Sequence, residues 1–247
     1  MREPRAYLYQ VVTRLCLDQL KSARARRETY VGTWLPEPLV DESAVQPRAG
    51  LAELAQDLSF ALLLTLERLT PAERAAFLLH DIFELDFREI GEVLGEDQSN
   101  CRQLAARARA HLREPRARFV PTVETSQRLL AAFMVAAASG DVAGLRRLFT
   151  DEAVYHADGG GRVSSALKPI HGADRIARFF VGALEKFPPP SDARVRPTAI
   201  NGLPGLVLHT PSAVLQTFAF EISPDGRIAA IYSTRNPDKL KHLRPDG

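Results

Sequence analysis

The sequence is poor in cysteine, methionine and tryptophan, and it contains no long apolar run. Its two cysteines, Cys16 and Cys101, do not make a disulfide framework, and neither has a neighbour at metal-ligand spacing. No apolar stretch approaches the ~20 residues that span a bilayer, and the N-terminus lacks the apolar core of a secretory signal. These absences predict a soluble, cytoplasmic protein that does not bind membranes, with no metal site and no cofactor.

Charge is distributed unevenly along the chain, although the formal net charge is only +2. Residues 2–27 carry seven basic side chains against two acidic ones, and residues 28–97 carry fifteen acids against four arginines. Residues 98–118 then carry six arginines against one glutamate. Two basic segments around an acidic middle favour two separate phosphate contacts, and the alternative is a pair of solvated helix faces.

The stretch 87–112 has the pattern of two helices joined by a tight turn. Phe87, Ile90 and Leu94 share one face of the first helix, and Gly95 suits its left-handed end. Asp97 is placed to cap the second helix by accepting a backbone N–H bond. This pattern predicts a DNA-binding helix-turn-helix, and the alternative is an ordinary helical hairpin with a solvated basic face.

The second of these helices has two contrasting faces. One face is apolar and is expected to be buried, and the other carries glutamine, serine and arginine. The apolar face comprises Cys101, Leu104, Ala105, Ala108 and Leu112, and the polar face comprises Gln98, Ser99, Arg102, Gln103, Arg107, Arg109 and Arg113.

Further helices are predicted before this motif. An amphipathic helix over residues 5–27 has Leu8, Val11 and Leu15 on one face. Two more helices, over 51–69 and 71–84, complete a compact all-α domain with the helix-turn-helix.

The proline-rich segment between these helices contains the only tryptophan, Trp34. Pro36 and Pro38 lack N–H donors and hold the preceding residues extended, as expected of a linker. An exposed Trp34 would be costly, so we expect it to dock on a surface. The alternative is a local contact with a neighbouring helix.

The chain changes character at Thr122. A long helix, a Gly-Asp turn, a short helix and a strand are predicted first, followed by a helix after His171-Gly172. Four strand-like segments then follow, near 193–200, 206–210, 213–222 and 227–234. Helices first and strands last predict an α+β domain in which a curved antiparallel sheet is curled around a helix.

Together these motifs resemble a known family. Residues 5–113 resemble an extracytoplasmic-function (group IV) RNA polymerase sigma factor, and residues 122–235 resemble a SnoaL-like, ketosteroid-isomerase-like cone domain. The segments that carry the resemblance are YVGTWLPEPL at 30–39, DGGG at 158–161 and NPDKL at 236–240. The resemblance implies four parts: a partial sigma region two at 1–29, a linker at 30–50, sigma region four at 51–118, and a SnoaL-like regulatory domain at 122–247.

The resemblance also implies a function and partners. The chain would direct the RNA polymerase core to promoter DNA and read the −35 element with the 97–113 helix. Gln98, Ser99, Arg102 and Gln103 would meet base edges or nearby phosphates, whereas Arg107, Arg109 and Arg113 would mainly hold the backbone. The basic helix would add a second contact at the −10 element. Its candidate side chains are Arg14, Lys21, Arg24, Arg26 and Arg27.

Region two departs from the family pattern, because a full region two has several helices before this one. The alternatives are a start recorded too far downstream, a shortened chain, and a degenerate sigma factor. Without a packing partner, the 5–27 helix is expected to be mobile, or to pack on the C-terminal domain or on a second molecule.

The cone domain raises the alternative of a small-molecule binding protein or an isomerase- or cyclase-like enzyme with a vestigial sigma part. Its acid–base candidates are Asp158, His156, His171, Tyr155 and Tyr232. The glycines after Asp158 favour a tight turn over a rigid catalytic base, so no catalytic residue is predicted.

A regulatory role is the preferred hypothesis for this domain, with the linker docked on two of its loops. A small-molecule effector in the cone, the sign of regulation, the promoter and the oligomeric state are left open. The docking residues expected are Trp34, Leu35, Pro36, Glu37 and Pro38 from the linker, and Asp158, Gly159, Gly160, Gly161, Asn236, Pro237 and Asp238 from the domain.

Overall fold

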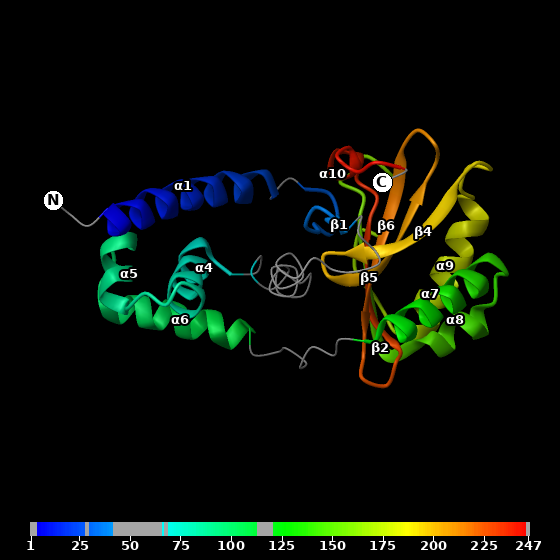
Figure 1. Ribbon diagram of the computed structural model, residues 1–247, viewed down its shortest axis with the longest axis horizontal. Helices are drawn as coiled ribbons and strands as arrows, with labels where there is room; N and C mark the ends of the chain where they lie inside the picture. Colours follow the sequence, from blue (N-terminus) through cyan, green and yellow to red (C-terminus); the bar gives the residue numbers. More distant parts are fainter. Residues whose placement is uncertain (1–3, 28–29, 42–65, 67–68, 113–120, 246–247) are drawn as a thin grey trace. The chain divides into compact units, whose positions relative to one another are not determined.

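The computed structural model describes residues 4–27, 30–41, 66, 69–112 and 121–245 (Figure 1). It divides into two compact units, one formed by Met1–Thr29 with Ala61–Ala117 and the other by Tyr30–Phe60 with Arg118–Gly247. The linker segment that starts at Tyr30 therefore belongs with the C-terminal unit. Most of the helix predicted over 51–69 lies outside the described residues.

The first unit is helical. Its core consists of small clusters around Leu79, Ile90 and Cys101 and around Ala76, Leu104 and Ala105. Its elements are α1 (Pro4–Arg27), α4 (Pro71–Phe77), η1 (Leu78–Ile82), α5 (Phe87–Leu94) and α6 (Gln98–Leu112).

The helix predicted over 71–84 begins as expected and ends differently. Thr70 and Glu73 form a capping box at the start of α4. The chain then widens into the π-helix η1, in which the Phe83 N–H donates to the Leu78 carbonyl at 3.0 Å. The same turn lets His80 Nδ1 lie 2.8 Å from the Leu85 carbonyl oxygen. A helical repeat in sequence does not distinguish α from π bonding, so this widening was not predicted.

Helix α1 packs on α5 and α4 within its own unit. The contact uses Tyr9, whose ring centroid lies 6.2 Å from that of Phe83, and Gln10, which donates to the Glu92 carbonyl at 3.4 Å. Two residues of the predicted apolar face, Leu8 and Leu15, are 60% and 65% exposed. The side of α1 that contacts α5 is an aromatic and polar one instead.

The second unit is α+β, as predicted. Its described helices are α7 (Val123–Ala138), α8 (Val142–Leu148), α9 (Ala173–Lys186) and α10 (Pro237–Leu240). Its described strands are β1 (Val40–Asp41), β2 (Phe149–Asp158), β3 (Ile170–His171), β4 (Arg194–Ile200), β5 (Leu203–His209), β6 (Val214–Ile222) and β7 (Ile228–Thr234), in the sheet order β1-β4-β5-β6-β7-β2-β3.

The sheet is mixed, which corrects the expectation of a purely antiparallel one. Five of its described strand pairs are antiparallel, but β2 and β7 run parallel. The long connection from β2 through α9 and the β4–β6 meander brings β7 back in the direction of β2. The carboxyl ends of these two strands, Asp158 and Thr234, therefore lie opposite each other.

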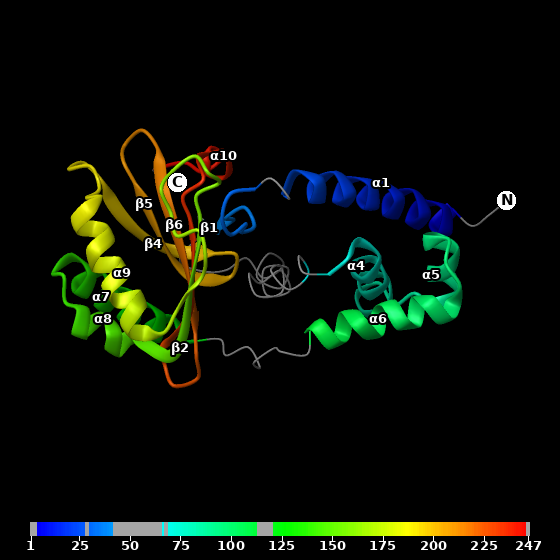
Figure 2. The same ribbon diagram turned by 180° about the vertical axis from the view of Figure 1, so that it is seen from behind.

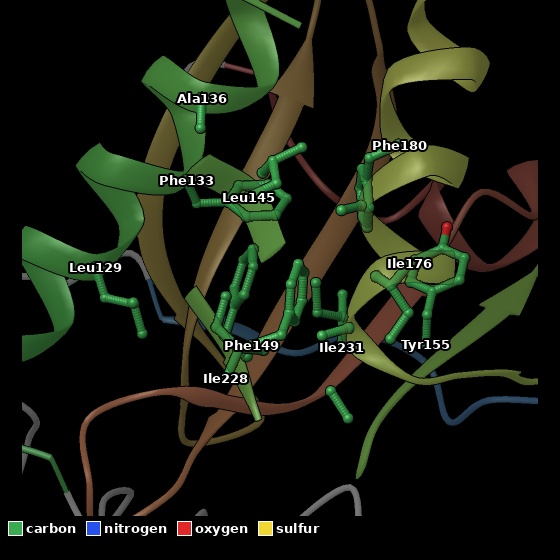
Figure 3. Packing of buried hydrophobic residues seen from close by; sticks show 14 of the residues in the cluster. Leu129, Phe133, Ala136, Leu145, Phe149, Tyr155, Ile176, Phe180, Ile228 and Ile231 are labelled. Carbon is green, nitrogen blue, oxygen red and sulfur yellow. The ribbon is translucent and has the colours of Figure 1, made fainter. Parts of the chain in front are cut away.

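Helices α7, α8 and α9 cover one face of this sheet, as both views show (Figures 1 and 2). The core between them is aromatic. The Phe133 ring meets the Phe180 ring edge-on at a centroid distance of 5.1 Å (Figure 3), and it meets the Phe220 ring edge-on at the same distance. We call this helix-covered side the inner face of the sheet and the opposite side the outer face. Along β7, Ile231 is an inner residue and Tyr232 an outer one.

Candidate functional site

Two helix caps and one left-handed glycine define the helix-turn-helix. Asp86 caps α5 by accepting bonds from the Arg88 and Glu89 N–H groups at 2.9 and 2.8 Å. Gly95 ends that helix in the left-handed region at φ 73°. The Asp97 carboxylate accepts the Asn100 N–H at 2.8 Å and caps the start of α6. The predicted turn is therefore the one observed.

Gly91 is a residue of this turn that the sequence pattern did not single out. A Cβ at this position would lie 2.6 Å from the Glu96 carbonyl oxygen, which is backbone and has little room to move. Because the turn passes this close to α5, a side chain at position 91 would push the two helices apart.

Helix α6 buries one side and exposes the other. Cys101, Ala105 and Ala108 are fully buried, and Leu104 nearly so. The Leu112 side chain lies outside the described residues. Four predicted base-contacting residues occupy the first two turns of α6, and their side chains are exposed: Gln98, Ser99, Arg102 and Gln103.

The arginines of α6 differ in what they contact. The guanidinium of Arg102 lies 5.8 Å from the Phe87 ring centroid, and Arg107 lies 3.2 Å from a Glu73 oxygen. Arg109 donates two hydrogen bonds to Asp81, each 3.0 Å long, which tie α6 to η1. Arg109 is therefore committed to an internal contact.

The remaining predicted phosphate contacts belong to α1 or follow α6 in sequence. Arg113 lies outside the described residues. Arg14 is exposed on α1. Lys21, Arg24, Arg26 and Arg27 belong to the same helix, but their side chains lie outside the described part of the structure.

In the second unit, the linker segment Tyr30–Asp41 lies on the outer face of the sheet, beside α10 (Figures 1 and 2). Its centre is the Asp158 carboxylate, which is fully buried. One carboxylate oxygen accepts bonds from the Tyr30 hydroxyl and from the Gly160 N–H at 3.1 Å. The other accepts the Leu35 N–H and the Lys239 ammonium, both at 2.8 Å. We call this arrangement, with the linker segment, the linker dock.

Lys239 completes the dock from α10, and its side chain is only 8% exposed. Besides pairing with Asp158, its ammonium donates to the Leu35 carbonyl. It also lies over the Trp34 ring, 4.2 Å from the centroid, and 5.2 Å from the Tyr30 centroid. Asp158 and Lys239 thus bind both backbone groups of Leu35, whose side chain is fully buried.

Tyr30 is held as a neutral phenol. Burial, followed by its hydrogen bond to Asp158, raises the pKa of the Tyr30 hydroxyl above its usual range. The Asn236 side-chain amide donates to the same hydroxyl oxygen at 2.9 Å. Asn236 also accepts the Asp238 N–H at 3.0 Å, which starts α10.

Glycine is required in the predicted DGGG segment because other groups approach it closely. Gly160 and Gly161 have φ of 59° and 70°, which disfavours other residues. A Cβ on Gly160 would collide with the Asn236 amide, and one on Gly161 would lie 3.0 Å from the Val31 side chain. A Cβ on Gly159 would lie 2.5 Å from the Val163 carbonyl oxygen.

Further along, the linker joins the sheet. Val40 and Asp41 pair with Ile200 and Ala199 as the added edge strand β1. The structure thus brings together most of the predicted docking residues. Pro36 and Pro38 are buried, whereas Glu37, Pro237 and Asp238 are exposed, with Asp238 paired to Arg162 at 3.4 Å.

Four dock residues were absent from the predicted set: Tyr30, Lys239, Asn201 and His242. Asn201 accepts the Leu39 N–H on its side chain at 2.9 Å, and a ring nitrogen of His242 lies 3.0 Å from the Pro38 carbonyl oxygen. A signal for Lys239 was present, because a buried aspartate needs a cation and Lys239 is the basic residue of NPDKL. A signal for Tyr30 was also present, because a buried aspartate needs hydrogen-bond donors and the Tyr30 hydroxyl opens the YVGTWLPEPL segment.

The acid–base candidates do not assemble into a catalytic group. Asp158, His156 and Tyr232 belong to the outer face, where Asp158 is occupied by the linker. His156 stacks on Tyr232 at 5.3 Å, and the Tyr232 hydroxyl donates to Glu221 at 2.8 Å. Tyr155 lies on the inner face, and its pKa is raised by burial. His171 is exposed on β3.

Among the described residues, no cluster of three or more histidine, cysteine or acidic side chains could hold a metal ion. None of the helices in this part of the chain is both long and apolar enough to cross a membrane.

Comparison with known proteins identifies two domains. Residues 59–112 match the family model described as Sigma-70, region 4, and residues 127–231 match the SnoaL-like domain model. The sigma match covers α4, η1 and the helix-turn-helix. The SnoaL match covers most of the C-terminal unit.

Relatives from Mycobacterium tuberculosis align with nearly the whole chain. The chain is 36% identical to the extracytoplasmic-function RNA polymerase sigma factor SigJ, over 96% of this chain and 78% of SigJ. It is 32% identical to the probable sigma factor SigI, over 99% of this chain and 81% of SigI. The crystal structure of SigJ superposes with a TM-score of 0.70 at 32% identity, covering 99% of this chain and 85% of that one.

Proposed function

Because this chain belongs to the extracytoplasmic-function family of RNA polymerase sigma factors, we propose that it reads the −35 promoter element with α6 and that its C-terminal unit regulates this activity through the linker dock. Its partners are the polymerase core and promoter DNA, and it acts in the cytoplasm, where both are found. It is not an enzyme, in keeping with relatives that are named as sigma factors.

The observation that carries the promoter-reading role is the exposed polar face at the start of α6. Gln98, Ser99, Arg102 and Gln103 project from the first turns of the second helix of a helix-turn-helix, the part that reaches base edges in such motifs. Arginine bonds guanine through two atoms, and glutamine does the same with adenine. The opposite side of α6 is buried, so the helix presents this face and no other.

Phosphate contacts supply affinity without sequence information. We assign them to Arg107, Arg109 and Arg113 after the base-contacting turns, and to the basic side chains of α1 at the −10 element. Those of α1 are Arg14, Lys21, Arg24, Arg26 and Arg27. Arg109 is the weakest of these assignments, because a phosphate would have to replace the two bonds it makes to Asp81.

The regulatory role is supported by the construction of the linker dock. The linker connects α1 to region four, and the dock holds residues 30–41 by backbone bonds, a buried ion pair and an added strand. A docked linker leaves less free chain between the two DNA-binding parts than a released one. Docking and release therefore set how far these parts reach along a promoter. An effector bound in the cone would act by favouring one of these two states.

Arginine-to-alanine replacement tests promoter reading. With holoenzyme assembled from the full chain and polymerase core, Arg102→Ala should weaken binding to a promoter selected by the wild-type holoenzyme about tenfold, because one good base contact is worth ~1–3 kcal/mol. Binding is measured by fluorescence anisotropy over a range of salt concentrations. Loss of a base contact should leave the salt dependence nearly unchanged, whereas Arg107→Ala should reduce its slope by about one.

The matched control is Arg175→Ala, which removes the same charge from an exposed position of α9. It should leave promoter binding at the wild-type level. If Arg102→Ala also binds as wild type, or if it weakens binding to unrelated DNA equally, α6 does not read bases through Arg102.

A further inference from the structure

A second polar cluster lies at the end of β7, on the inner face of the sheet and separate from the linker dock. Tyr155 on β2 hydrogen-bonds with Ser233 on β7, and Ser233 Oγ accepts the Gln216 side-chain amide at 2.7 Å. Arg235 follows on the same side of the chain, just after β7. Burial raises the pKa of the Tyr155 hydroxyl, and the nearby positive charge of Arg235 acts against this rise. Strands β2, β6 and β7 therefore bring the polar side chains of Tyr155, Gln216 and Ser233 together on the inner face.

The residues of the inner face differ in exposure. Leu206, Phe220 and Ile222 are buried in the aromatic core. Leu208, Gln216 and Phe218 lie on the same two strands and are partly exposed, and Leu208 pairs with Gln216. The polar cluster is thus bordered on β5 and β6 by side chains that reach solvent. Tyr155 and Ser233 are the buried members of this cluster (Figure 3 shows Tyr155 beside Ile176).

Arg235 has bonding capacity that the described residues do not use. One terminal nitrogen donates to the Ser164 carbonyl at 2.7 Å, but its buried Nε has no hydrogen-bond partner there. No carboxylate among the described residues forms an ion pair with it. A buried guanidinium N–H without an acceptor is costly, and a carboxylate matches the guanidinium fork through two parallel bonds.

We propose that this cluster binds a small amphipathic carboxylate. The carboxylate would pair with Arg235 and accept a bond from Tyr155 or Gln216, and the apolar body would lie against Phe179 and Phe218. Both phenylalanines are partly exposed and pack on the core from α9 and β6. The ligand class follows from one cation, neutral donors and aromatic walls at one site.

The same site is bonded directly to the linker dock. The backbone N–H groups of Arg235 and Asn236 both donate to the Asp158 carbonyl, at 2.7 and 3.0 Å. Arg235 turns to the inner face, whereas Asn236 reaches Tyr30 in the dock on the other side. A carboxylate that draws Arg235 inward therefore acts on the peptide units that support Asp158. This coupling rests on the proposed regulatory function, but the binding site does not.

Calorimetric titration of the full chain tests the site. The probes are decanoate and hydrocinnamate, each with its neutral alcohol, decanol and hydrocinnamyl alcohol. Each acid should bind about tenfold more tightly than its alcohol, because a bond to a charged partner is lost in the alcohol. Arg235→Gln should remove this preference, and Tyr155→Phe, which deletes one hydroxyl, should weaken the acids without abolishing folding. Arg227→Gln, at the other end of β7, is the matched control and should bind as wild type.

The outcomes separate the site from its regulatory use. Failure of both acids to bind, equal binding of acid and alcohol, or an acid preference retained in Arg235→Gln and Tyr155→Phe would each overturn the site. Coupling is read from the fluorescence of Trp34, the single tryptophan, which lies in the linker dock. Acid binding that shifts this emission in wild type but not in Arg235→Gln supports coupling. Binding without a shift leaves the site standing and refutes its link to the dock.

Discussion

The linker dock and the exposed face of α6 are both rich in polar side chains, yet they use them in opposite ways. In the dock, the buried Asp158 carboxylate takes four donors from its own chain. On α6, Gln98 and Gln103 are turned to solvent. A buried polar group that is fully bonded holds a structure together, whereas an exposed one is available to a partner. Substitutions in the dock should therefore lower stability, and those on α6 should lower affinity.

The largest effect expected is that of Asp158→Ala. It leaves the Lys239 ammonium buried without its carboxylate, which should reduce the free energy of unfolding by ~3–5 kcal/mol. Urea denaturation of the full chain, followed by Trp34 fluorescence, measures this loss.

Asp174→Ala is the control for this prediction, because its partner Arg178 is exposed and the stability should hardly change. Equal losses in the two variants would show that the dock is no stronger than a surface ion pair. If Asp158→Ala lowers stability but leaves promoter output unchanged, the dock is structural and the proposed regulation fails.

Tyr30→Phe should alter how stability depends on alkaline pH. The folded-state pKa of Tyr30 is raised, so above the ordinary tyrosine value of ~10 the unfolded chain loses this proton first. Stability present at neutral pH should then fall as the pH rises, by at most ~1.4 kcal/mol for each pH unit. Urea midpoints at neutral and alkaline pH should converge between wild type and Tyr30→Phe. Tyr155 is present in both proteins, so a wild-type slope retained by the variant would locate the effect elsewhere.

A smaller effect on stability is expected for Arg109, which lies on α6 but is paired as the dock residues are. Its paired bonds to Asp81 make it the α6 arginine most like a dock residue, although both side chains are partly exposed. Arg109→Ala and Asp81→Ala should each cost ~0.5–1 kcal/mol, and the double variant little more than either one. Thermal unfolding monitored at the helical circular dichroism band gives these values. Additive losses would mean that the pair is not coupled, and a loss of promoter affinity in Arg109→Ala alone would support its assignment to the phosphate contacts.

Local features were the most predictable from sequence. The turn at Gly95, the cap at Asp97 and the buried stripe of α6 follow from residue types a few positions apart. The order of helices and strands in the C-terminal unit follows from periodicity. In contrast, the parallel pairing of β2 with β7 could not be predicted, because side-chain alternation is the same for both strand directions.

The sequence motifs predicted which segments form the dock, but not which side-chain bonds hold it together. Trp34 and Asp158 were expected to meet, whereas Lys239 was not, because an isolated lysine in a short polar helix is usually solvated. Its burial depends on Asp158 and Trp34, which are far away in sequence. Likewise, the packing of α1 on α5 through Tyr9 and Gln10 was not predicted, because apolar periodicity does not reveal which face of a helix finds a partner.

The place of β7 and α10 after α6 in the chain has a consequence for the order of events during synthesis. The linker dock needs β7 and α10, which are made some 125 residues after the end of α6. At ~5–20 residues per second, a ribosome completes the helix-turn-helix about 6–25 s before the last part of the dock. Each new molecule therefore passes through a period in which its helix-turn-helix has been made but its linker has nothing to dock on.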